Sequence, residues 1–330
     1  MPLVPDASTP PSQLRVAGVL SAAVAAISLA AIFTRLADAP GGVVALWRMV
    51  FATALIAPSG LRALGRRPPP LRALVPALAA GVLLAAHFAT WLTSLQYTTV
   101  AASVTLVTTV PIWVALFAWI GGTAPTRGVA VGLVLAIAGG AMIGFGDLHG
   151  GSAPLLGDAL ALAGAITVAG YFLLGRRAQR AGLSTGGYAF VAYATAALVL
   201  LPLPALLDAP YLSWPAATWG WIVAMAAVPQ LIGHTGLNWA NRHLDPTVVA
   251  TVTLLEPIGA GLLAWLLFSE VPGALTLLGA PVLLGGVALV VRFRRRAPAA
   301  DGLTTGAAAS RATSTAPSAP LGRTRDDLVE

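Results

Sequence analysis

The sequence contains no cysteine and no lysine, and it contains little charge of either sign. Without cysteine, the chain can form no disulfide, thiolate metal site or cysteine nucleophile. Charged residues make up 9% of the 330 residues, whereas soluble domains carry about 25%. Together with 57% hydrophobic residues, this composition is typical of an integral membrane protein.

Long apolar runs are abundant, and each has about the 20 residues that a helix needs to cross roughly 30 Å of hydrocarbon. The first run starts with little charge and a second follows at once, which favours a retained helix over a cleaved signal peptide. We expect an all-α membrane protein with ten transmembrane helices. They are predicted at residues 16–35, 41–58, 74–95, 99–119, 127–146, 156–175, 187–206, 218–240, 246–268 and 273–292.

The nineteen arginines test this count, because positively charged loops stay in the cytoplasm. With a cytoplasmic N-terminus, the outer loops hold only Arg35, and Asp38 offsets it. The arginines in the inner loops and at the start of the segment after the last predicted helix are Arg62, Arg66, Arg67, Arg72, Arg127, Arg176, Arg177, Arg180, Arg242, Arg292, Arg294, Arg295 and Arg296. An even number of helices and two cytoplasmic termini follow. The same placement explains the net charge of +7 without a nucleic-acid partner.

The two ends of the chain lie outside the predicted helices. Residues 1–15 form a cytoplasmic N-terminal tail, and residues 297–330 form an Ala/Thr/Ser/Pro-rich tail that we expect to be disordered. The predicted location is the cytoplasmic membrane, the inner membrane of a two-membrane cell, with the lipid bilayer as the surrounding partner. Neither a monomer nor a homodimer is favoured.

An internal repeat divides the chain into halves at residues 16–146 and 156–292. With a shift of 146 residues, Pro111 aligns with Pro257 and Trp119 with Trp265; with a shift of 147, HFATW (87–91) faces HTGLNW (234–239). Each half holds five predicted helices. Because five is odd, the second half is inverted relative to the first, which is typical of secondary transporters.

Glycines at four-residue spacing indicate close helix packing within the fifth predicted helix. The pairs are Gly128 with Gly132 and Gly140 with Gly144. We expect these pairs to pack against other helices of the same chain rather than to form a dimer.

Polar side chains inside the apolar runs are functional hypotheses, because ionisable groups are costly within a bilayer. Arg48 could bind a ligand, form a structural contact or extend toward the membrane surface. His87 and His234 fit neutral, hydrogen-bonded core histidines as well as cavity residues. Asn238 lies one turn after His234.

Glu256 precedes Pro257, and proline opens a helix by removing a backbone donor. A carboxyl group beside such a break could bind a ligand or exchange protons, which makes the proton a candidate coupling ion. It could equally be an interhelical tie to Arg48 or Asn238. In the first half, Thr109 lies near Pro111, so both prolines are predicted helix breaks.

Trp91 and Trp239 lie near the ends of their predicted helices, where they could belong to aromatic belts or line a cavity. The chain has no GxxxxGK[ST] motif, and its loops are too short for a catalytic domain. We therefore expect no enzyme activity, no metal and no cofactor.

Three segments resemble the EamA-type domains of the drug/metabolite transporter superfamily. They are ALWRMVFATALIAP (45–58), SLQYTTVAASVTLVTTVPIWVALFAW (94–119) and GHTGLNWANRHLDPTVVATVTLLEPIGAGLLAWLLFSEVP (233–272). The resemblance covers about residues 15 to 292. One departure is GGTAPTRG (121–128), which lacks an acid where Glu270 follows the ninth predicted helix.

The resemblance implies two repeats around a central cavity and ATP-independent export or exchange of metabolites, amino acids or drugs. The resemblance makes these residues candidates for lining the cavity or gating it: Arg48, His87, Trp91, Tyr97, His234, Asn238, Trp239 and Glu256. Thr109 is a further candidate. The predicted function is a secondary exporter that works by alternating access. The alternatives are an intramembrane enzyme on lipid-linked substrates and a non-transporting sensor or assembly factor. Neither substrate nor flux direction follows from the residues.

Overall fold

The computed structural model describes residues 11–66, 68–98, 100–122, 124–145, 152–268 and 274–293. Within these ranges all regular structure is helical, as the composition predicts. The helices of the first half are α1 Gln13–Ser28, α2 Ala30–Ala37, α3 Gly41–Arg66, α4 Leu71–Ser94, α5 Val100–Val107, α6 Val110–Ile120 and α7 Arg127–Phe145. Those of the second half are α8 Pro154–Arg180, α9 Thr185–Leu200, α10 Leu203–Leu206, α11 Ala216–Met225, the π-helix η1 Ala226–His234, α12 Thr235–His243, α13 Pro246–Val252, the 3₁₀-helix η2 Thr253–Leu255, α14 Glu256–Phe268 and α15 Ala274–Phe293.

Helical segments coincide with all ten predicted spans, and eight of them are long and apolar enough to cross a membrane. These eight are Gln13–Ala37, Gly41–Arg66, Leu71–Ser94, Ala102–Ile120, Pro154–Arg180, Thr185–Leu206, Ala216–His243 and Pro246–Leu267. The other two, α7 and α15, contain shorter apolar stretches at Arg127–Met142 and Leu277–Val290. Ten crossings and cytoplasmic termini therefore stay predictions. The C-terminal tail, residues 297–330, lies outside the described residues.

The fourth and ninth predicted spans are each interrupted near their middle. In the fourth predicted span, α5 ends at Val107 and α6 begins at Val110, with Pro111 as its second residue. In the ninth predicted span, α13 ends at Val252, η2 follows, and Glu256 and Pro257 begin α14. Proline fits the first turn of a helix, where no backbone donor is needed, but it cannot continue a preceding one. The interruptions lie at the positions that the prolines predicted.

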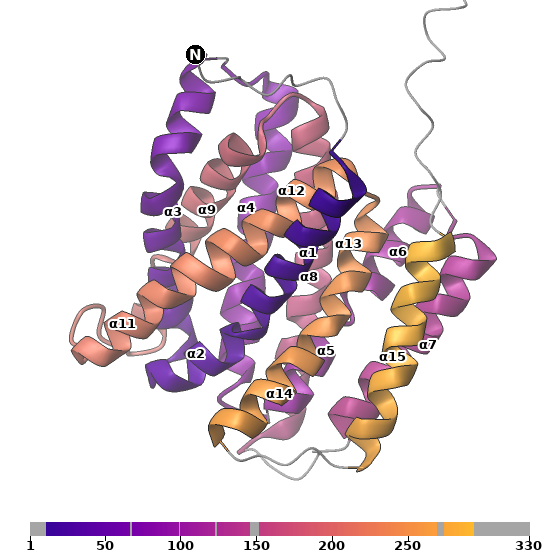
Figure 1. The fold of residues 1–330 in the computed structure, drawn as a ribbon. Coiled ribbons are helices and arrows are strands. Elements are labelled where there is room, and N and C mark those ends of the chain that lie inside the picture. Colours follow the sequence, from indigo (N-terminus) through magenta and orange to yellow (C-terminus); the bar gives the residue numbers. More distant parts are fainter. Residues whose placement is uncertain are drawn as a thin grey trace, which may run out of the picture. The chain divides into compact units, whose positions relative to one another are not determined.

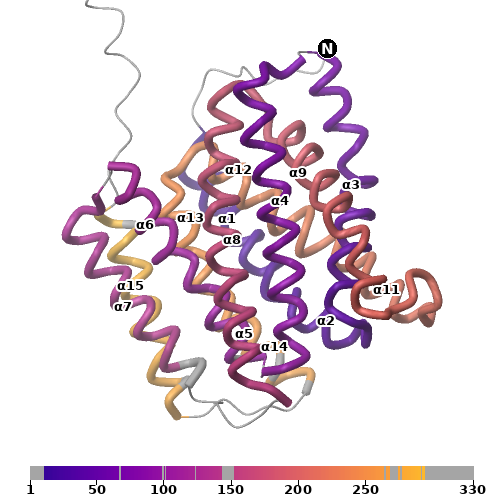
Figure 2. The backbone as a smooth tube through the Cα atoms, turned by 180° about the vertical axis from the view of Figure 1, so that it is seen from behind, coloured from indigo at the N-terminus to yellow at the C-terminus, as the bar shows by residue number. Residues whose placement is uncertain are grey.

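Helices that are far apart in the sequence pack side by side in the helical body (Figure 1). α4 packs along α8 and α3 along α9, and α1 contacts η1 and α12. α7 and α15 lie together at one edge of the bundle, as both views show (Figure 2). Each of these contacts joins one half of the chain to the other, so the halves form a shared interior instead of two separate cores.

The interface between α7 and α15 depends on glycine. A Cβ added at Gly139 would lie 2.3 Å from the backbone nitrogen of Leu283, and one added at Gly286 would lie 2.3 Å from that of Ala136. Gly128 and Gly132 likewise face Phe293 and Val290, so the expected packing within the chain is present at these two positions.

Gly140 was expected to pack closely against another helix. That expectation is wrong, because a Cβ added at Gly140 would meet nothing within 4 Å. Its neighbour Gly139 makes the close contact instead, one residue earlier along the helix. The side-chain surroundings of Gly144 lie outside what the structure describes.

Candidate functional site

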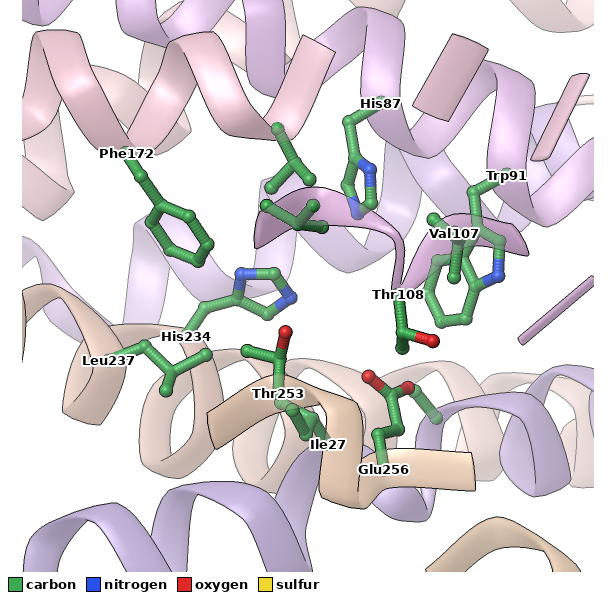
Figure 3. A pocket seen from close by; sticks show the side chains of 13 residues that line it. Ile27, His87, Trp91, Val107, Thr108, Phe172, His234, Leu237, Thr253 and Glu256 are labelled. Carbon is green, nitrogen blue, oxygen red and sulfur yellow. The ribbon is translucent and has the colours of Figure 1, made fainter. Parts of the chain in front are cut away.

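A partly open cavity lies among helices of both halves, with about 420 Å³ of empty space that includes solvent at its mouth. Figure 3 shows side chains of both halves pointing into this space from several helices. α1, α2, α4 and the α5–α6 break contribute from the first half, and α8, η1, α12, η2 and α14 from the second. The lining consists of Ile27, Ala30, His87, Trp91, Val107, Thr108, Val110, Val168, Phe172, His234, Leu237, Thr253 and Glu256.

The cavity is lined by residues that occupy equivalent positions in the two repeats. His87 is matched by His234 at the shift of 147. Val107 is matched by Thr253, and Val110 by Glu256, at the shift of 146. In the last two pairs the first-half residue is apolar and its second-half counterpart is polar. The Glu256 carboxyl and Thr253 hydroxyl groups, which we call the polar wall, therefore have no polar counterpart at the equivalent first-half positions.

The broken helices place the polar groups of this wall. Glu256 is the first residue of α14 and is 7% exposed, and Thr253 is the first residue of η2. From the first half, Thr108 occupies the turn between α5 and α6, and Figure 3 shows it near the Glu256 carboxyl group. No hydrogen bond or ion pair joins Glu256 to Arg48 or Asn238 within the described part of the chain. The tie between helices is absent from this conformation, and Glu256 faces the cavity.

Two histidines and a tryptophan also line the cavity. His87 in α4 contacts the backbone oxygen of Gly164 through Nδ1 at 2.9 Å, and its ring stacks on Trp91 at 5.6 Å between centroids. Trp91 is only 3% exposed, which excludes a place in an aromatic belt at the membrane surface. Its indole Nε1 has no hydrogen-bond partner among the described residues. The His234 ring lies 6.2 Å from that of His87.

His234 ends a π-helical segment, η1, that also contains Pro229. Proline supplies no backbone donor, and insertions of this kind are frequent at functional sites. The wider helix brings Gln230 and His234 toward α3 and α4. Gln230 Nε2 and His234 Nδ1 are both buried, and neither has a partner among the described residues.

Arg48 does not line the cavity. It lies behind Phe88, which in turn contacts the lining residue His234. The Arg48 side chain is 0% exposed, which excludes one of the three alternatives, extension toward the membrane surface. Arg48 Nε donates to Gln230 Oε1 at 2.9 Å, and the guanidinium carbon lies 4.1 Å from the centroid of the Phe88 ring. Phe88 in turn meets His234 edge to face at 5.3 Å.

Four further predicted residues lie outside the cavity. Asn238 donates from Nδ2 to Tyr171 Oη at 2.5 Å, within the second half. Trp239 is half-buried and has the Arg15 guanidinium 5.5 Å from its ring. Tyr97 occupies the turn after α4, and Thr109 donates to the Leu106 oxygen at 2.7 Å.

Sequence reasoning missed several lining residues. Phe172, Val168 and Thr253 carry no distinguishing signal, because a single apolar sequence does not show which helix face meets the partner half. Gln230, which contacts Arg48 and does not line the cavity, did carry a signal. It stands four residues before His234, which stands four before Asn238, and polar residues at that spacing share a helix face.

Comparisons with known proteins bear on the family and the fold of the chain. The sequence model described as the EamA-like transporter family matches residues 16–145 and 155–292, one copy in each half. The predicted resemblance is thereby confirmed. No curated protein matches the chain. One crystal structure of a protein has a TM-score of 0.69 at 20% identity, covering 85% of this chain and 98% of its own. At that identity the likeness shows the fold alone.

Proposed function

The chain belongs to the EamA-like transporter family, and from that premise we propose that it is a secondary transporter that moves a small molecule by alternating access without ATP hydrolysis. The observation that carries the proposal is the cavity lined by repeat-equivalent residues at paired helix breaks. Two halves that build one cavity with equivalent positions can exchange roles, which gives inward-open and outward-open states of similar energy.

Helix packing supports the same proposal. With the shift of about 146 residues, α3 corresponds to α9 and α7 to α15, and both pairs pack along each other. Helices that pack on their own repeat counterparts lie near the axis that would relate inverted halves. Rocking of the halves about these contacts would open the cavity to one side and then the other.

The polar wall supports a coupling role for Glu256. Its carboxyl group faces the cavity, is nearly buried and has no tie to Arg48 in this conformation. An acid in that position can bind a substrate group or a proton, but its charge is costly within the bilayer. The proposed direction is export, from the cytoplasm across the cytoplasmic membrane.

Two measurements in sequence test this function. The first compares the metabolites in medium and cells with and without the gene, and a compound depleted from the medium of the deletion strain identifies cargo and direction. The second measures uptake of that compound into inverted vesicles with and without a pH gradient. Absence of any difference in the first, together with no uptake of the candidate compounds in the second, would contradict the proposal.

A further inference from the structure

Arg48 is a buried cation that makes no ion pair with an acidic side chain among the described residues. It is 0% exposed within a predicted transmembrane helix, α3. Only its Nε is hydrogen-bonded, and Nη1 and Nη2 have no partner among the described residues. A buried charge that lacks a partner is strongly destabilising, and inside a bilayer such groups usually mark a substrate or ion site.

The neighbouring polar groups are also unsatisfied. Gln230 Oε1 accepts a hydrogen bond from Arg48, while Gln230 Nε2 is buried and has no hydrogen-bond partner in the described structure. One turn later along the same helical segment, His234 Nδ1 is likewise unpaired. Two guanidinium nitrogens and an amide nitrogen, all donors, therefore lie close together beside an imidazole. Unpaired buried donors are rare in native proteins and require an explanation.

The chemistry that satisfies these donors is a planar oxyanion. The two terminal nitrogens of a guanidinium match the two oxygens of a carboxylate, and such charge-assisted pairs are stronger than neutral hydrogen bonds. An amide donor at the side adds a further contact to the same group. The apolar cavity residues Val168, Phe172 and Leu237 suit the hydrocarbon part of a small organic acid.

One aromatic layer separates Arg48 from the cavity. The guanidinium carbon lies 4.1 Å from the centroid of the Phe88 ring, and the ring of Phe88 contacts that of His234 at 5.3 Å. His234 itself lines the cavity. A rotation of these two rings would therefore give a ligand in the cavity access to the guanidinium.

We propose that Arg48 and Gln230, with His234 beside them, bind the carboxylate group of a small organic anion that reaches them from the cavity past Phe88. The inference rests on the proposed transport function and adds the chemical class of the substrate to it.

The test is binding of carboxylates to the purified full-length chain in an uncharged detergent. Acetate, hexanoate and benzoate are titrated, each beside its neutral amide, and the shift of the thermal unfolding midpoint is followed by intrinsic tryptophan fluorescence. We expect at least one carboxylate to raise the midpoint in a saturable way, with its amide roughly tenfold weaker or inactive, because only the carboxylate pairs with the guanidinium.

Variants assign the response to Arg48. Arg48→Gln should abolish the carboxylate response, and Arg48→Lys should retain a weaker one, because lysine keeps the charge but not the two-pronged geometry. Arg62→Gln is the matched control, since Arg62 lies on the same helix but is exposed, and its response should equal that of the native chain. If Arg48→Gln does not fold, the graded loss in Arg48→Lys and in Gln230→Leu still reports on the site.

The result that overturns the inference is a folded Arg48→Gln that responds like the native chain, or a native chain that responds to no carboxylate. Its failure is distinguishable from failure of the transport function. Carboxylates that bind but are not transported in proteoliposomes would contradict transport and leave the site standing. Transport of a compound without a carboxylate group would contradict the carboxylate site and leave the transport function standing.

Discussion

Glu256 and Val110 occupy equivalent positions in the two repeats and line the same cavity, yet only Glu256 has an ionisable side chain. The helix break beside each is shared, because Pro111 and Pro257 start α6 and α14 in the same way. The helix break is thus common to both halves, whereas the carboxyl group is present in only one. This difference makes Glu256 the residue at which coupling is best tested.

Replacing Glu256 with Gln should remove the dependence of transport on a pH gradient while leaving exchange of substrate for substrate intact. The amide has nearly the same shape but cannot carry a proton between the two sides of the membrane. Uptake into inverted vesicles, with and without the gradient, measures both activities. Asp208→Asn is the control, because Asp208 is exposed and lies outside the cavity, and asparagine also tolerates its positive φ of 50°. Full gradient-dependent transport by Glu256→Gln would remove the coupling role.

At the scale of single elements, the structure uses two kinds of helix irregularity. Prolines interrupt two of the spans that reach the cavity, and glycines allow α7 and α15 to approach each other closely. The first kind creates polar, open backbone at the centre, and the second makes a tight contact at the edge of the bundle. They should respond differently to substitution.

Pro257→Ala should slow transport several-fold with little loss of stability. Alanine restores a backbone donor and favours a continuous helix from α13 into α14, so the Glu256 side chain would be displaced from the cavity. Initial transport rates and the thermal unfolding midpoint are the two readouts. The control is Pro281→Ala, since Pro281 lies inside α15 and not on the cavity. Equal transport by both variants would show that the break is not functional.

Gly139→Ala should destabilise the protein by about 1–3 kcal/mol, because its Cβ would lie 2.3 Å from the Leu283 backbone nitrogen and overpack the interface. The adjacent Gly140→Ala should be neutral or slightly stabilising, since nothing lies within 4 Å of the added carbon. Thermal unfolding of the two variants in parallel gives the comparison. Equal midpoints would mean that α7 and α15 do not approach as described.

At the scale of the whole molecule, the sequence alone predicted the helical class, the two halves and most of the cavity's polar residues. Apolar runs and proline act locally, so they are visible in one sequence. Arg48 was identified, but its place behind Phe88 was not, because that depends on how α3 meets η1 across the two halves. Thr253 and Phe172 were missed for the same reason, whereas the spacing of Gln230 and His234 could have revealed Gln230.

The predicted topology can be tested with single cysteines, because the native chain contains none. Ser152 precedes α8 and Ser184 precedes α9, and both are exposed. In intact cells, Ser152→Cys should react with a membrane-impermeant maleimide, and Ser184→Cys should react only after permeabilisation. The reverse pattern would place the termini outside, and labelling of both from one side would show that α8 does not cross the membrane.

The most direct test of alternating access uses the cavity itself. Val107→Cys and Thr253→Cys place one thiol at each of two repeat-equivalent positions in the lining. In oriented vesicles, the membrane-impermeant maleimide is applied to one face at a time and the labelling rate is followed. The account predicts that each thiol reacts from both faces, and that a transported substrate changes the ratio of the two rates. Labelling from a single face only, or from neither face, would contradict a cavity that opens alternately to the two sides.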